Sequence, residues 1–140
     1  MRLKGSSLSD ERTIARFCRA ASFSDGKLQP TAFLLREKQQ REEYLSVNCL
    51  EILHQNKLTA LGKFKSLISK KLSVKPNSGA AILNVGSLVN NAEIQRIAKL
   101  SVLNGLNNNE PSYSGIFGYP MDQDLIAELI LEVVQETIRY

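Results

Sequence analysis

The chain has 140 residues, of which 43% are apolar and 23% are charged, and its formal net charge is +4 at pH 7. This length and this balance are typical of one globular domain with its own core, and they argue against disorder except near the ends and in one Asn-rich stretch. The sequence therefore predicts a single domain over residues 1–140, with residues 1–7 flexible.

The net charge conceals an uneven distribution along the chain. Residues 1–75 contain 15 basic and 7 acidic side chains, whereas residues 76–140 contain 3 basic and 7 acidic ones. Such a separation can steer an oppositely charged partner, and it can equally let two parts of one fold attract each other. Both explanations stay open.

Cysteine usage and hydropathy bear on compartment and cofactors. Cys18 and Cys49 do not form a Cys-x-x-Cys pair and are too few for a zinc site, so we expect buried, inert thiols. The N-terminal segment lacks the apolar core of a signal peptide, and no segment approaches the roughly 18 apolar residues of a membrane helix. The sequence thus predicts a cytoplasmic protein that does not contact a membrane and that holds no metal and no cofactor.

The first predicted element is a helix that begins after Ser7 and Asp10, whose spacing fits a capping box. One apolar face of this helix would consist of Ile14, Phe17, Cys18 and Ala21. Three basic side chains would lie on the opposite side, namely Arg12, Arg16 and Arg19. They could form an ordinary solvated ridge or a surface that contacts phosphate groups.

Two strands are predicted next, over residues 31–36 and 44–48, and the charged segment 37–43 joins them. Because this connection is short, the pattern predicts an antiparallel hairpin. Asn48 would then cap a short helix at 49–51 that breaks near 54–56. A longer helix is predicted over 57–72, with Lys63 and Lys70 pointing away from an apolar stripe. That stripe consists of Leu58, Leu61, Phe64, Ile68 and Leu72.

Residues 80–85 form an apolar strand that we expect in the centre of the sheet. A short helix at 92–97, a strand at 100–103 and a loop at 106–115 follow. Residues 122–140 predict one long helix whose apolar arc is wider than an ordinary stripe. Such an arc fits a helix central to the domain, or a helix with one flank on a partner such as a second copy of the chain.

Together these elements predict an α+β fold. We expect a mainly antiparallel sheet of roughly four strands, packed by two or three helices. The central and C-terminal helices would cover one face of that sheet.

No catalytic set is predicted. His54 is the only histidine of the chain, and it stands in a polar helix break without an orienting partner. Gly115 and Gly118 are too few for a phosphate loop. No cluster of acidic, histidine or cysteine residues has metal-ligand spacing, so the sequence favours a role other than catalysis.

A candidate binding site combines the predicted hairpin with the predicted loop, because long ordered loops often carry function. Its members are Arg36, Tyr44, Ser46 and Asn48 on the hairpin and Ser112, Tyr113 and Ser114 on the loop. An arginine with hydroxyl and amide groups suits a phosphate, a carboxylate or a nucleotide-like ligand. Alternatively, these residues form the solvated face of an amphipathic hairpin beside an ordinary loop.

The same residues carry a resemblance to other proteins. Residues 33–36 read Phe-Leu-Leu-Arg, residues 43–51 read Glu-Tyr-Leu-Ser-Val-Asn-Cys-Leu-Glu, and residues 111–116 read Pro-Ser-Tyr-Ser-Gly-Ile. This combination resembles a set of small, uncharacterised bacterial proteins with the motifs F-x-L-R, E-Y-L-S-V-N-W-L-E and P-S-H-S/A-G-I. The resemblance spans residues 16–132 and implies no particular activity. Cys49 stands where that set has Trp, and Tyr113 where it has His, which favours a structural or binding role because tyrosine is a poor acid or base near neutral pH.

Three functions follow from these patterns. The first is a small bacterial binding or accessory protein that acts through contacts with another protein or with a second copy of itself. The second is a nucleic-acid-binding protein that uses the basic side chains of Arg12, Arg16, Arg19, Lys63 and Lys70. The third is an enzyme acting on a nucleotide-like or other anionic small molecule, in which Glu51 would join Arg36, Ser46, Asn48 and Tyr113.

Overall fold

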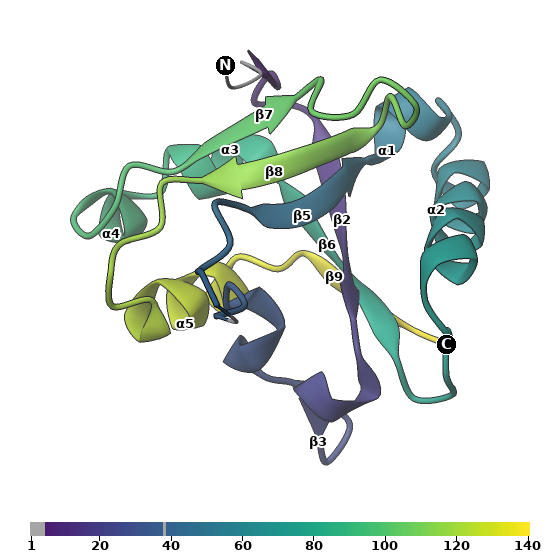
Figure 1. Ribbon diagram of the computed structural model, residues 1–140, viewed down its shortest axis with the longest axis horizontal. Helices are drawn as coiled ribbons and strands as arrows, with labels where there is room; N and C mark the ends of the chain where they lie inside the picture. The colour runs from purple at the N-terminus through teal and green to yellow at the C-terminus, as the bar shows by residue number, and fades with distance from the viewer. Residues whose placement is uncertain (1–4, 38) are drawn as a thin grey trace.

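The computed structural model describes residues 5–37 and 39–140. Within them, a seven-stranded antiparallel sheet has the order β1-β7-β8-β5-β2-β6-β9, and β3 and β4 form a separate small hairpin (Figure 1). The strands are β1 (Ser6–Ser7), β2 (Thr13–Cys18), β3 (Phe23–Ser24), β4 (Lys27–Leu28), β5 (Leu45–Cys49), β6 (Gly79–Asn84), β7 (Ser101–Asn104), β8 (Tyr113–Phe117) and β9 (Glu136–Arg139). The helices are α1 (Leu50–Leu53), α2 (Lys57–Lys71), α3 (Val85–Val89), α4 (Ala92–Gln95) and α5 (Asp124–Glu132), with the 3-10 helices η1 (Ala20–Ser22) and η2 (Pro30–Phe33). Across the described residues, no helix combines the length and the apolar character that a bilayer crossing requires.

The predicted α+β class and antiparallel pairing are confirmed, but the large sheet has seven strands instead of roughly four. Strands β5, β6 and β7 fall where strands are predicted, and α1, α2 and α4 fall where helices are predicted. The additional strands arise from segments with other predictions. Residues 1–7 are predicted to be flexible, yet Ser6 and Ser7 pair with Asn104 and Leu103 of β7; residues 1–4 lie outside the described residues.

The prediction of an N-terminal helix is wrong, because residues 13–18 form β2 inside the sheet. Ile14 and Cys18 are buried in the core on one face of the sheet, and Ala15 is buried in the core on the other face. A strand covered on both faces has apolar residues in succession rather than in alternation. In this segment the apolar residues Ile14, Phe17 and Cys18 also have the spacing of one face of a helix, and this coincidence explains the wrong prediction.

The predicted hairpin of residues 31–36 and 44–48 does not form. Residues Pro30–Phe33 form η2, which packs against α5. Pro30 favours such a helical turn because its φ angle is already close to the helical value. Strand β5 pairs instead with β2 and β8, so its neighbours come from distant parts of the chain.

Helix α2 forms as predicted. It follows Asn56, whose Oδ1 accepts a hydrogen bond from the Thr59 N–H at 3.0 Å. Three side chains of α2 are buried against the sheet, namely Ala60, Phe64 and Ile68. Leu58 is 80% exposed, so the apolar stripe does not extend into the first turn as predicted.

The predicted helix over residues 122–140 is wrong in its second half. Helix α5 ends at Glu132, and Glu136–Arg139 form β9, which pairs with β6. The apolar arc that suggested a very broad helix face therefore combines a helix with an edge strand. The helical part of the arc, Ile126, Ala127, Leu129 and Ile130, is buried in the core. It leaves no wide apolar flank of α5 that needs a partner.

Helices cover both faces of the large sheet, and each face has its own core. Side chains of α3, α4, α5 and η2 pack on one face, and side chains of α1 and α2 pack on the other (Figure 1). The predicted arrangement, in which the central and C-terminal helices share a face, is therefore wrong. The predicted loop over 106–115 is also too long at its end, because Tyr113 already begins β8.

Strands β2 and β5 separate after a short contact, and this separation positions the candidate site. Ile14 pairs with Cys49 and Ala15 pairs with Asn48. Beyond these pairs, β2 continues beside β6 whereas β5 continues beside β8. We call the region between residues 16–18 of β2 and residues 45–47 of β5 the fork; Figure 1 shows the two strands diverging there.

Candidate functional site

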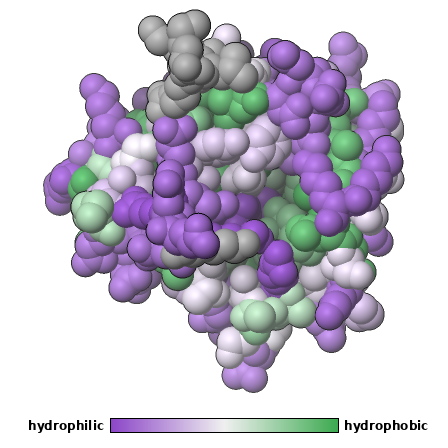
Figure 2. All heavy atoms as spheres, in the orientation of Figure 1, coloured by the Kyte–Doolittle hydropathy of each residue, from purple (hydrophilic) through white to green (hydrophobic). Residues whose placement is uncertain are grey.

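A cavity of about 350 Å³ occupies the fork. Its walls come from β2, β5, η2 and the residues after it, α2, and Tyr113 at the start of β8. Figure 2, in the orientation of Figure 1, shows hydrophilic residues on the outer side of α2 and hydrophobic residues farther inward, toward the fork. The cavity thus joins segments that are far apart in the sequence.

Arg16 of β2 is held at the cavity wall by the backbone of two other segments. Its Nε donates a hydrogen bond to the Ala32 carbonyl at 3.0 Å, and its Nη1 donates one to the Ser46 carbonyl at 2.9 Å. The Ser46 carbonyl faces the β2 side of β5, since alternate residues of a strand bond to opposite neighbours. The Arg16 side chain therefore replaces a hydrogen bond that β2 would supply if the fork were closed.

The Arg16 guanidinium keeps donors for a ligand. Burial lowers the pKa of Arg16, but an arginine side chain stays charged in proteins and has five N–H donors. Two of these donors are used on the two carbonyls. Arg16 itself lines the cavity, so its other N–H groups lie at the cavity wall.

The cavity is rich in positive charge. Besides Arg16, the cationic side chains that line it are Arg19, Arg36 and Lys71. Within the described residues, none of the three arginines forms an ion pair. Glu42 also lines the cavity, and its Oε1 accepts a hydrogen bond from the Arg36 backbone N–H at 2.7 Å. The balance at the wall favours an anion.

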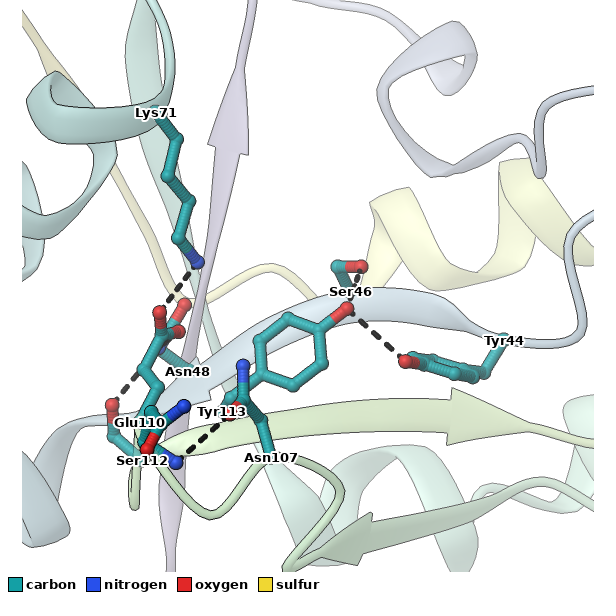
Figure 3. Close-up of polar contacts among 9 residues, drawn as sticks. Tyr44, Ser46, Asn48, Lys71, Asn107, Glu110, Ser112 and Tyr113 are labelled. Atoms are coloured by element: carbon teal, nitrogen blue, oxygen red, sulfur yellow. Dashed lines mark hydrogen bonds and ion pairs between the residues drawn. The ribbon is translucent and has the colours of Figure 1, made fainter. Parts of the chain in front are cut away.

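The hydroxyl groups of Tyr44, Ser46 and Tyr113 meet next to the cavity (Figure 3). The Tyr113 hydroxyl lies 2.8 Å from Ser46 Oγ and 3.2 Å from the Tyr44 hydroxyl. Burial raises the pKa of Tyr44, and its hydrogen bond with Tyr113 raises it further. The Tyr44 ring stacks on Phe117, with ring centroids 4.8 Å apart. Tyr44 therefore positions Tyr113, and Ser46 and Tyr113 present their hydroxyls at the cavity wall.

A second polar group lies at the other end of the Tyr113 ring (Figure 3). Asn48 Nδ2 donates hydrogen bonds to Glu110 Oε2 and to Ser112 Oγ, both at 2.9 Å. Glu110 Oε1 also forms an ion pair with Lys71 Nζ at 2.5 Å. The predicted role of Asn48 as a helix cap is wrong, because α1 has Cys49 at its N-cap position and the Asn48 amide is committed to these contacts. Asn48 instead ties the 105–112 loop to the sheet.

The structure brings most of the predicted site residues together. Arg36, Ser46, Asn48 and Tyr113 line the fork cavity, and the two others in contact with them are Tyr44 and Ser112. Ser114 lies apart, because it points to the opposite face of β8. Its Oγ donates to the Ser112 carbonyl at 3.0 Å and accepts from the Asn104 amide at 3.1 Å.

Glu51 also lies apart from the cavity. Its Oε1 accepts a hydrogen bond from the Thr13 backbone N–H at 2.8 Å, at the closed end of the fork. Burial by itself would raise the pKa of Glu51, but the hydrogen bonds that its carboxylate accepts, chiefly from Thr13 and also from the Glu51 N–H and Cys49, together lower it below its ordinary value. Glu51 therefore stabilises the junction of β2 and β5.

The five residues of the predicted basic surface do not form one surface. Arg16 and Arg19 line the fork cavity, whereas Lys63 and Lys70 line a different cavity. The Arg12 carbonyl accepts from the Val85 N–H at 3.0 Å, at the far end of β2. A helical arginine ridge cannot exist here, because these residues lie on and around a strand.

The different cavity is a groove of about 680 Å³ between α1, α2 and residues 109–112. Ile52, Leu53, Leu67 and Pro111 give it apolar walls, with lysines beside them. It is larger than the fork cavity, but its wall brings together no arginine and no hydroxyl cluster of the kind found in the fork. The Lys71–Glu110 ion pair stands between the two, since Lys71 lines the fork cavity and Glu110 lines the groove.

The residues considered for other chemistry are placed as follows. Cys18 and Cys49 are free and buried, as predicted, and burial raises the pKa of Cys18 to about 11. His54 is exposed, and its Nδ1 accepts a hydrogen bond from the Asn56 N–H at 2.9 Å. In the part of the chain that the structure describes, no group of three or more His, Cys, Asp or Glu side chains could hold a metal ion.

Sequence reasoning missed the structural role of Arg16 and the contributions of Glu42, Lys71 and Glu110. A signal for Arg16 exists, since it is the only charged residue in the segment Thr-Ile-Ala-Arg-Phe-Cys of β2. A charge inside a buried strand needs compensating hydrogen bonds. Once the segment is assigned to a helix, that signal disappears.

Comparisons of the chain with protein-family models, with curated proteins and with solved structures gave no match. The resemblance of the sequence motifs to small bacterial proteins stays a prediction.

Proposed function

We propose that the protein binds a small anionic molecule in the fork cavity, through a phosphate or carboxylate group of that molecule. The observation that carries this proposal is the fixed guanidinium of Arg16, bonded to two backbone carbonyls at 3.0 and 2.9 Å. A preorganised donor loses little conformational entropy on binding, and planar guanidinium groups suit carboxylate and phosphate oxygens. Arg16 would anchor the anion.

Other groups of the cavity would complete the coordination of that anion. Arg19 and Arg36 are exposed and are free of ion pairs within the described residues, so either can turn toward a bound anion. The hydroxyls of Ser46 and Tyr113 supply neutral donors. A cavity of about 350 Å³ is at the lower end of the size range of small-molecule sites. The proposed ligand is therefore a small molecule and not a macromolecular surface.

The first two functions predicted from the sequence have less support, and of the third, an enzyme, only the binding of an anionic small molecule is proposed. Binding to a protein partner stays a prediction, but its main ground was the broad apolar arc, which combines the buried part of α5 with β9. Nucleic-acid binding was motivated by a continuous basic surface, and the side chains of Arg16 and Lys63 line separate cavities. Anion binding in the fork uses more of the observed contacts.

Isothermal titration calorimetry with pyrophosphate tests this proposal. We expect Arg36→Gln to weaken pyrophosphate binding about tenfold, because a hydrogen bond to a charged group is worth roughly 1.5 to 3 kcal/mol. Arg36 is exposed and its backbone contacts do not need the side chain, so the variant should fold normally.

Arg96→Gln is the matched control, since it removes the same charge from an exposed position next to α4, outside the cavity. Its affinity for pyrophosphate should equal that of the unmodified protein. An equal loss in both variants would mean that net charge alone attracts the anion. Lack of pyrophosphate binding even at low ionic strength would reject the proposal.

A further inference from the structure

The fork cavity has a neighbour that the proposed function does not use. A cavity of about 390 Å³ adjoins it, and the two share Phe17, Arg19 and Leu72 as lining residues. Ala20, Ala21, Ser73, Lys75 and Ser78 complete the wall of this second cavity. We call it the side cavity.

The two cavities differ in chemistry. The fork cavity contains Arg16 and Arg36 together with the hydroxyls of Ser46 and Tyr113. The side cavity has a mainly apolar wall, in which the aromatic ring of Phe17 is half-buried and Leu72 is 36% exposed. Arg19 belongs to both. A ligand that fills both cavities would therefore have an anionic end and a flat or apolar end.

We infer that the ligand is a nucleoside phosphate, with its phosphate in the fork cavity and its base in the side cavity against Phe17 and Leu72. This inference rests on the proposed function, because it needs the fork cavity to hold an anion. An aromatic side chain can stack on any of the nucleobases, and such stacking contributes substantially to binding affinity. Arg19, at the border of the two cavities, is placed to contact either the phosphate or the base.

Polar groups at the rim of the side cavity could contact the edge of a base. Lys75 is exposed and lines the cavity together with Ser73. Ser78 is less suited, since its Oγ donates to the Lys75 carbonyl at 2.6 Å. Because the apolar wall dominates, we expect affinity to depend on the presence of a base more than on which base it is.

Calorimetric titrations with ribose 5-phosphate and adenosine 5′-monophosphate test the inference, since the two probes carry the same phosphate and differ in the base. We expect the monophosphate to bind about tenfold more tightly, in the range that one base–aromatic stack provides. Phe17→Leu keeps an apolar side chain against the core and should remove most of this advantage.

A second variant keeps the test independent of Phe17 packing. Ala21 is exposed and lines the side cavity, so Ala21→Phe would fill the cavity without removing a core contact. We expect Ala21→Phe to bind adenosine 5′-monophosphate only as tightly as ribose 5-phosphate. The affinity for ribose 5-phosphate should be the same as in the unmodified protein.

The outcomes separate this inference from the proposed function. Equal binding of the two probes would overturn the inference and leave anion binding in the fork intact. Absence of binding by both probes and by pyrophosphate would overturn both. An affinity that rises steadily with the length of an oligonucleotide would also overturn the inference, because the two cavities would then be part of a longer nucleic-acid surface.

Discussion

Strand β2 has two neighbours, and it pairs with them very differently. Along β6 it forms a continuous ladder, from Thr13 opposite Asn84 to Cys18 opposite Gly79. Along β5 it forms the pairs Ile14–Cys49 and Ala15–Asn48 and then diverges. The ladder with β6 builds the core, whereas the interrupted ladder with β5 creates a cavity with access to backbone and side-chain donors.

Two side chains bracket the short β2–β5 contact and replace strand hydrogen bonds. At the open end, Arg16 donates to the Ser46 carbonyl of β5. At the closed end, the Glu51 carboxylate accepts from the Thr13 N–H of β2. The fork is thus stabilised by a cation where a backbone carbonyl has no strand partner, and by an anion where a backbone N–H has none. Both contacts avoid the cost of burying an unsatisfied backbone group.

The largest effect is expected from Arg16→Met, which removes the cation at the open end. It leaves the carbonyls of Ala32 and Ser46 without their donor, and we expect a loss of about 3 kcal/mol in the free energy of unfolding. Urea denaturation measures this loss. Arg19→Met serves as the control, because Arg19 is exposed and should change stability by less than about 0.5 kcal/mol. Similar losses in both would mean that Arg16 does not hold the fork.

An intermediate effect is expected from Gly115→Ala, at the β5–β8 arm of the fork. A Cβ at this position would collide with the Tyr44 ring, which carries the hydroxyl that contacts Tyr113. Overpacking of this kind costs about 1 to 3 kcal/mol, and it should also displace Tyr113 and weaken pyrophosphate binding.

The control for Gly115→Ala is Gly62→Ala in α2, where an added Cβ meets nothing within 4 Å. We expect this variant to be more stable than the unmodified protein by about 0.5 to 1 kcal/mol, because alanine favours helix. Denaturation midpoints of the two variants should therefore move in opposite directions. Midpoints that move the same way would contradict the predicted clash.

The smallest effect is expected from Glu51→Gln, at the closed end. The pKa of Glu51 is lowered in the folded protein from its ordinary value of 4.5, so its carboxylate form stabilises the fold above that pH. This contribution disappears as the pH falls through the folded-state pKa. The stability difference between the protein and the variant should therefore be constant near neutral pH and shrink below about pH 4.5, in urea titrations at several pH values. A difference that does not change down to pH 3 would contradict this role.

The predictability of each element depended on how its faces are covered. Helix α2 was found because one side is buried through Phe64 and Ile68 while lysines face solvent. Strand β2 was missed because both of its faces are buried, and β9 was missed because Ile138 continues the apolar spacing of α5. Periodicity identifies an element with one covered face much better than an element with two.

The candidate site was predictable in its residue types more than in its architecture. The sequence placed Arg36, Ser46, Asn48 and Tyr113 in one group, and all four line the fork cavity. The predicted reason, a hairpin between 31–36 and 44–48, was wrong, and the anchor Arg16 was assigned to a helix surface. Pairing between strands that are distant in the chain cannot be predicted from local residue spacing. A cavity that forms where two such strands stop pairing therefore cannot be predicted from that spacing either.

The strand order has a consequence for the order of events in folding. The segments that form the fork come from residues near 16, 46, 71 and 113, and the β2–β6 ladder joins the beginning of the chain to its middle. Contacts between remote segments require the closure of long loops before any interaction compensates for the lost chain entropy, which slows folding. The binding cavity therefore cannot exist in a partly folded intermediate that contains one half of the chain, and its appearance marks the completion of the native topology.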